Sequence, residues 1–176
     1  MPAKHNDPRL IAIDLRSQQF GYAVFEGPKH LMDYGGGQLR PGGQAGSVLA
    51  VRRIGQLIKQ FNPSALATKL PDQHVISRRP GIRTIANAIR RETSMHLIPF
   101  SLIGRGDIQE AFGIFKTGNK HEIGLVLAEI FPELLWKLPA KRKLGDPEHP
   151  RMVVFDAISV GFTYWQQNGT QIPPPE

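Results

Sequence analysis

The chain has 176 residues, a formal net charge of +7 from 22 Lys and Arg against 15 Asp and Glu, and no cysteine. This length predicts one domain, residues 1–176, with an ordinary buried core, and the missing cysteines exclude disulfides, thiolate zinc sites and thiol nucleophiles. No apolar run approaches membrane-spanning length and the first residues lack an apolar leader, so we expect a cytoplasmic protein with no membrane partner.

The first half of the chain predicts three strands followed by a helix. Residues 10–13 are four apolar residues in a row, as in a strand packed on both faces, and Asp14 follows them. Residues 20–27 and 30–39 predict two further strands, and the short Gly-Pro connection between them favours antiparallel hairpins. The apolar period then becomes helical over residues 47–61.

The second half alternates strands and helices. In order, the patterns predict a strand at 65–69, a helix at 81–95, an edge strand at 97–103, short helices opened by capping boxes at Asp107 and Asn119, and an apolar helix at 151–167. The expected fold is therefore α/β: a mixed five-stranded sheet, with an antiparallel meander of strands 1-2-3 extended by crossover strands 4 and 5, flanked by helices. Residues 1–8 and 168–176 are predicted to be flexible tails.

An acidic residue, Asp156, interrupts the last predicted helix, which is otherwise almost entirely apolar. Such a helix is buried, and a buried charge without a partner costs several kcal/mol. Two interpretations are open. Asp156 either caps a helix that starts at Ala157 or pairs with Arg151, or it meets Asp14 across a cleft.

Three stretches resemble the RuvC-like and YqgF-like nucleases of the RNase H-like superfamily, in the same order along the chain. LIAIDLRSQQFGYAVFE, residues 10–26, is similar to their opening hairpin, in which an Asp ends the first strand. IGRGDIQEAFGIFKTGNKHEIGLVLAEI, residues 103–130, resembles their helix pair, including Lys120 at the start of the second helix. FDAISVGFTYW, residues 155–165, resembles their last helix, so the likeness spans residues 10–165 and implies an RNase H-like fold.

The resemblance also implies a metal site. In this family, acids on the first strand, the fourth strand and the last helix hold two Mg²⁺ or Mn²⁺ ions, which activate water and stabilise the leaving oxygen of a phosphodiester. Asp14 is then the first-strand ligand and Asp156 the last-helix ligand. The chain departs from the pattern at Lys69, where the family has its strand-four Glu, and at Val153, where it has a further ligand. Asp72 stands where family members carry an aromatic wedge.

Three interpretations of this departure are open. In the first, the Lys69 ammonium lies between Asp14 and Asp156 in place of the metal, and the scaffold survives without its chemistry. In the second, a relocated ligand completes a weakened site, taken from Asp72, His149 or Glu148. In the third, the resemblance holds for the fold alone and both aspartates are caps.

Basic residues gather on one predicted helical hairpin and in one predicted loop. The candidate nucleic-acid-binding residues are Arg78, Arg79, Arg83 and Arg90 on the hairpin, Lys141, Arg142 and Lys143 in the loop, and Arg16, Arg105 and Lys120 near strand or helix ends. A positive surplus attracts polyanions, so these residues predict a track for phosphates if they flank the cleft. The alternative is a solvated helix face and a charged loop.

The sequence therefore predicts a RuvC-like domain that binds nucleic acid, DNA rather than RNA, and the resemblance implies branched DNA and a homodimer. Lys69 puts nuclease activity in question. Two alternatives are open: a Mg²⁺- or Mn²⁺-dependent endodeoxyribonuclease of the junction-resolvase type with a relocated third ligand, and a non-catalytic structural or partner-binding protein on the same fold.

Overall fold

A mixed sheet of five strands, in the order β3-β2-β1-β4-β5, forms the centre of the computed structural model, which describes residues 7–39 and 44–170. The strands are β1 (Arg9–Leu15), β2 (Gln19–Glu26), β3 (Leu31–Gln38), β4 (Ala65–Lys69) and β5 (Phe100–Leu102). β1, β2 and β3 pair antiparallel, whereas β4 lies parallel to β1 and β5 parallel to β4. The predicted meander with two crossover strands is confirmed.

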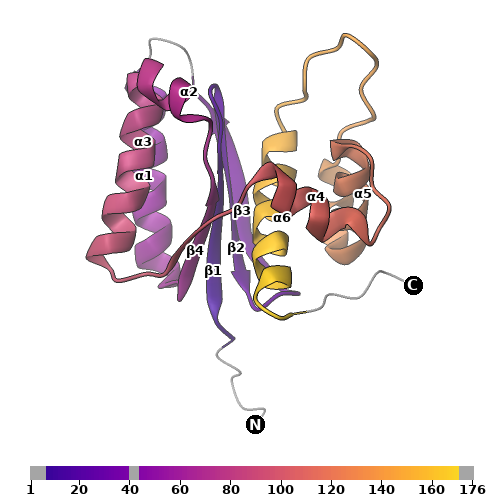
Figure 1. Ribbon diagram of the computed structural model, residues 1–176, viewed down its shortest axis with the longest axis horizontal. Helices are drawn as coiled ribbons and strands as arrows, with labels where there is room; N and C mark the ends of the chain where they lie inside the picture. Colours follow the sequence, from indigo (N-terminus) through magenta and orange to yellow (C-terminus); the bar gives the residue numbers. More distant parts are fainter. Residues whose placement is uncertain (1–6, 40–43, 171–176) are drawn as a thin grey trace.

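Helices cover both faces of this sheet (Figure 1). On one face lie α1 (Gln44–Phe61), α2 (Gln73–Arg78) and α3 (Pro80–Met95); on the other lie α4 (Arg105–Gly113), α5 (Lys120–Ile130), the 3₁₀ helix η1 (Pro132–Lys137) and α6 (Met152–Gln167). The apolar run of β1 contributes side chains to the cores on both faces of the sheet. Leu10 and Ala12 pack toward α6, while Ile11 and Ile13 pack toward α1 and α3.

The buried helix α6 packs directly on β1 and β2. Gly21 of β2 permits this approach, because a Cβ atom there would overlap the backbone carbonyl oxygen of Val153. Gly161 does the same on α6, where a Cβ atom would overlap the ring of Phe25. The two glycines therefore set how close α6, and with it Asp156, comes to the sheet.

Some boundaries differ from the sequence predictions. α4 begins at Arg105 rather than Asp107, because Gly104 is the N-cap and the Asp107 carboxylate accepts a hydrogen bond from the Gly104 backbone N–H at 2.6 Å. The Asn119 cap is confirmed by the hydrogen bond that its side chain accepts from the Glu122 N–H. α2 and η1 were not predicted. Most of the predicted tails, at 1–6 and 171–176, lies outside the described residues.

No helix in the part of the chain that the structure describes is long and apolar enough to cross a membrane.

Candidate functional site

Asp14 and Lys69 lie side by side at the carboxyl ends of β1 and β4. The parallel register pairs them directly, because both strands run toward the same edge of the sheet. The Asp14 side chain is fully buried, and its Oδ1 atom is 3.7 Å from the Lys69 Nζ. Lys69 therefore stands next to the first-strand carboxylate.

Asp156 reaches the same edge from α6. This helix begins at Met152, so Asp156 lies in its second turn and is not an N-cap. Its side chain is 14% exposed and its Oδ2 atom accepts a hydrogen bond from the Arg16 guanidinium. The interpretation in which Asp156 caps a helix or pairs with Arg151 is therefore wrong, and Asp156 faces Asp14 across the end of the sheet.

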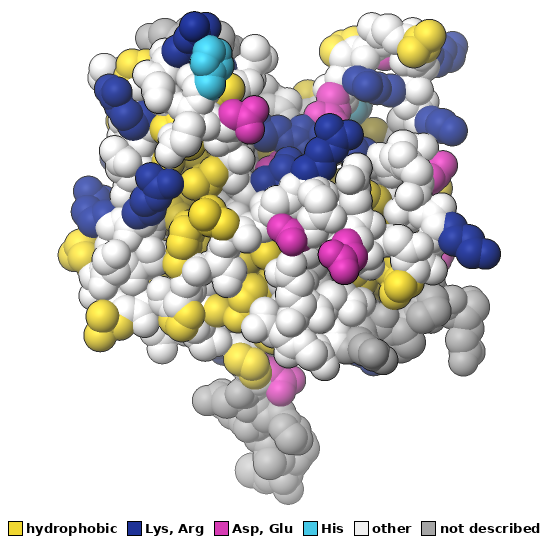
Figure 2. Space-filling model, in the orientation of Figure 1, with side chains coloured by type: hydrophobic (Ala, Val, Ile, Leu, Met, Phe, Trp, Pro, Cys, Tyr) yellow, Lys and Arg dark blue, Asp and Glu magenta, His cyan; other side chains and the backbone are white. Residues whose placement is uncertain are grey.

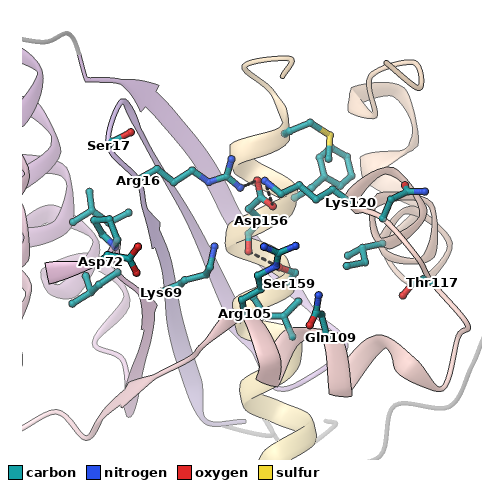
Figure 3. A pocket seen from close by; sticks show the side chains of 18 of the residues that line it. Arg16, Ser17, Lys69, Asp72, Arg105, Gln109, Thr117, Lys120, Asp156 and Ser159 are labelled. Atoms are coloured by element: carbon teal, nitrogen blue, oxygen red, sulfur yellow. Dashed lines mark hydrogen bonds and ion pairs between the residues drawn. The ribbon is translucent and has the colours of Figure 1, made fainter. Parts of the chain in front are cut away.

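Arg16, two residues after Asp14, joins three carboxylates at once. Its Nε donates to Asp14 Oδ2 at 2.8 Å, its Nη1 to Glu148 Oε2 at 2.5 Å, and its Nη2 to Asp156 Oδ2. The side chain is 19% exposed, and Figure 3 shows it extending across the end of the sheet toward Asp156. The planar fork of a guanidinium suits this role, since it presents donors in fixed directions.

Two lysines flank this cluster on opposite sides. The Lys120 Nζ at the start of α5 donates to Glu148 Oε1 at 2.8 Å and lies 3.7 Å from Asp156 Oδ1. Lys69 forms its ion pair with Asp14. The prediction that Lys69 lies between Asp14 and Asp156 is corrected: Arg16 spans both carboxylates, because it extends from the turn after β1 directly over the end of the strand.

We call these six side chains the charge cluster: Asp14, Glu148 and Asp156 with Arg16, Lys69 and Lys120. Three carboxylates face three cations, so the cluster balances its own charge. Arg16 was predicted as a phosphate-binding residue rather than as the centre of this network. A sequence signal existed, because residues two apart in an extended strand share a face, and Arg16 follows Asp14 with that spacing.

The protonation of the charge cluster follows from burial and partners. Burial raises the pKa of Asp156 to about 6, with the attraction of Arg16 and Lys120 opposing it and the repulsion of Asp14 and Glu148 adding to it. For Glu148, burial acts upward, but the hydrogen bond from Lys120 and the charge of Arg16 outweigh it and lower the pKa. Burial disfavours the charged form of Arg16, yet the three carboxylates outweigh it and raise its pKa, so the guanidinium stays charged.

The residues at this site do not fit the metal pair that the sequence resemblance implies. Within residues 7–39 and 44–170, no three His, Cys, Asp or Glu side chains are arranged to hold a metal ion. The Arg16 guanidinium fills the space among the carboxylates, and an ion at Asp14 would also meet the Lys69 ammonium. Asp72 and His149 are exposed and form no ion pair with the charge cluster, and within the described residues neither belongs to a group of three potential metal ligands.

A pocket of about 760 Å³ opens over the charge cluster. Figure 3 shows Lys69, Arg105 and Lys120 directed with Arg16 toward the same space. The predicted residues that line the pocket are Arg16, Lys69, Asp72, Arg105, Lys120 and Asp156. Asp14 lies buried beneath it. Of the basic predictions, Arg105 is exposed and forms no ion pair within the described chain.

The remaining predicted basic residues do not line the pocket. Arg78 lies on α2, Arg83 and Arg90 on α3, and Lys141, Arg142 and Lys143 in the loop before α6, and all six are exposed. Arg79, between α2 and α3, is half-buried. In Figure 2, basic side chains gather in a hollow between two raised parts of this face. Whether the outer residues belong to one track with the pocket stays a prediction.

Comparison with known proteins shows similarity to solved structures; no family model and no curated protein sequence matches. RuvC of T. thermophilus in complex with a Holliday junction substrate superposes with a TM-score of 0.65 at 16% identity, covering 93% of this chain and 97% of that one. A second Thermus thermophilus RuvC structure gives a TM-score of 0.63 at 16% identity, with 92% and 97% covered. The yeast mitochondrial Holliday junction resolvase Ydc2 gives 0.50 at 14% identity, with 93% and 83% covered. At these identities the likeness concerns the fold, and the chain has the RuvC-type RNase H-like fold that the sequence resemblance implied.

Proposed function

We propose that this protein binds DNA over the pocket and does not hydrolyse it by a divalent-metal mechanism. The observation that carries the proposal is the Arg16 guanidinium, which contacts Asp14, Glu148 and Asp156 together. It puts a permanent side-chain cation at the place where the fold's nucleases use Mg²⁺ or Mn²⁺.

The loss of metal chemistry follows from charge and burial. A divalent ion could reach Asp14 and Asp156 only if Arg16, which is 19% exposed, left three carboxylates and moved into solvent. The ion would then lie next to Lys69, at a position where the family pattern has a glutamate. A guanidinium can hold carboxylates together, but it cannot coordinate and activate a water molecule as a metal ion does.

The binding half of the proposal rests on the cations that line the pocket and on the surplus charge. Lys69 and Arg105 face the pocket together with Arg16 and Lys120, and the whole chain carries a net +7. Such a surface attracts the phosphate backbone and binds it in a salt-dependent way. We take DNA rather than RNA, and branched DNA in particular, from the fold likeness to two junction-resolving proteins. A homodimer stays a prediction.

One observation favours the alternative of an active endonuclease. Glu148, one of the residues considered as a relocated ligand, lies in the charge cluster beside Asp156. Both of its oxygens, however, already accept hydrogen bonds from Arg16 and Lys120. For this reason we place the active nuclease second.

The test is a gel assay on a four-way DNA junction and a matched duplex, in EDTA, Mg²⁺ and Mn²⁺. We expect retarded, uncut DNA in all three conditions. Arg105→Glu, at the pocket, is expected to weaken binding more than Arg52→Glu, which makes the same charge change at an exposed position of α1 outside the pocket. Metal-dependent cutting that disappears in Asp14→Asn would establish the nuclease instead. Absence of any binding would favour the partner-binding alternative.

A further inference from the structure

Glu148 is the one acid of the charge cluster that comes from a loop. Asp14 and Asp156 belong to β1 and α6, and their side chains are 0% and 14% exposed. Glu148 belongs to the segment between η1 and α6, which projects beyond the helices in Figure 1, and its side chain is 28% exposed. Of the three carboxylates it is the one that an incoming anion can replace at least structural cost.

The two oxygens of Glu148 bind two different cations. Oε2 accepts from Arg16 Nη1 at 2.5 Å, and Oε1 accepts from Lys120 Nζ at 2.8 Å. Two non-bridging oxygens of a phosphate can accept charge-assisted hydrogen bonds from the same pair of donors. Arg16 and Lys120 both line the pocket, so a phosphate in the pocket has access to them.

The rest of the loop is attached mainly to itself. Asp146 accepts a hydrogen bond from the Lys143 backbone N–H through its side chain and another from the Arg142 guanidinium through its carbonyl oxygen. Residues 140–147 are all exposed. Among the described ion pairs, those of Glu148 are the ones that connect this segment to the body of the protein.

We infer that Glu148 is an internal substitute for a DNA phosphate. In the free protein its carboxylate occupies a phosphate subsite made by Arg16 and Lys120. A backbone phosphate of bound DNA replaces it there, and the loop with Lys141, Arg142 and Lys143 is released to follow the strand. This inference rests on the proposed function for the identity of the ligand, but the subsite itself takes any phosphate oxyanion.

The experiment compares Glu148→Gln with Glu129→Gln. Both variants remove one negative charge, but Glu129 is exposed on α5 and forms no ion pair in the described chain, so it controls for the change in overall charge. Pyrophosphate affinity is measured by calorimetry, and affinity for a fluorescent four-way junction by anisotropy. We expect Glu148→Gln to bind pyrophosphate about tenfold more tightly than Glu129→Gln, which corresponds to about 1.4 kcal/mol of competing carboxylate contact.

A second measurement uses the unaltered protein, in case Glu148→Gln does not fold. Saturating pyrophosphate is expected to speed tryptic cleavage after Lys141, Arg142 and Lys143, because displacement of Glu148 frees the loop. Lys120→Gln should abolish this acceleration. Equal pyrophosphate affinities in the two variants, or an unchanged cleavage rate in the unaltered protein, would overturn the inference. Lack of junction binding in every variant would instead refute the proposed function, while the pyrophosphate comparison still decides the role of Glu148.

Discussion

Replacing Arg16 by methionine tests whether this side chain is the resident cation of the site. The change keeps the apolar stem and removes a guanidinium that bonds three carboxylates. Hydrogen bonds to charged groups contribute about 1.5–3 kcal/mol each, so three give a ceiling of about 4.5–9 kcal/mol. Proton uptake by Asp156, whose pKa is about 6, and the remaining lysines recover part of this loss. We expect a net loss of about 3–5 kcal/mol at pH 8 and a smaller loss at pH 5.

The assay is urea unfolding followed by circular dichroism, with Arg16→Met, Asp14→Asn and the double variant measured together. Once Arg16 is gone, the charge of the fully buried Asp14 is the one least screened by solvent from the repulsion of the other carboxylates. Asp14→Asn should therefore restore part of the lost stability. Arg52→Met, on an exposed position of α1, is the control and should change stability by less than about 0.5 kcal/mol. Additive effects of the two changes, or a loss at Arg16 no larger than the control, would refute the reasoning.

Two further predictions concern the position and the protonation of Asp156. Between pH 3.8 and about pH 6 the carboxyl group of Asp156 is protonated in the folded protein but ionised in the unfolded chain. The stability of the protein relative to Asp156→Asn should therefore fall by up to about 3 kcal/mol as the pH rises from 4 to 7. Denaturant midpoints at each pH check this, and a pH-independent difference would contradict it. Gly21→Ala should cost about 1–3 kcal/mol, because the new methyl group overlaps the Val153 carbonyl. Gly55→Ala, in α1 with open space around it, should stabilise the protein in the same thermal scans; equal shifts for the two alanines would disprove the close approach of α6.

Apolar periodicity predicted a sheet with helices on both faces, because the unbroken apolar run of β1 is typical of a strand that is buried on both sides. The same pattern placed Asp14 and Lys69 at the ends of two predicted strands, but their position side by side was implied only by the resemblance to the RuvC-like nucleases, and the parallel register of β1 and β4 confirms it. The contact between Glu148 and Lys120 in the charge cluster was harder to predict. Glu148 lies in an irregular loop with no period, and its meeting with Lys120 depends on tertiary packing between segments 28 residues apart.

Arg16 shows what a spacing rule can and cannot predict. Its distance from Asp14 in the sequence put both side chains on the same side of the strand, but that rule does not tell how far a long side chain reaches beyond the end of the strand. The position of the Arg16 side chain is decided by three carboxylates, from β1, from α6 and from the loop before α6. Each of them binds a different nitrogen of the guanidinium. The prediction assigned the bridging role to Lys69 because it considered only the positions at which the family carries metal ligands. Arg16 lies outside those positions, in the turn after β1.

If Arg16 is the resident cation, as proposed, the site does not need a metal ion to balance its acids. In a two-metal site the carboxylates repel one another until the ions arrive, so metal ions stabilise the fold and their removal destabilises it. Here Arg16, Lys69 and Lys120 balance the three acids as soon as the chain folds. We therefore expect the same melting temperature in EDTA and in millimolar Mg²⁺ or Mn²⁺. The double variant Arg16→Met with Lys69→Glu is the matched control: it adds the missing acid and removes the fixed cation, and its melting temperature should rise with Mn²⁺. A metal-dependent rise in the unaltered protein would mean that an ion can displace Arg16, and the nuclease alternative would then take precedence.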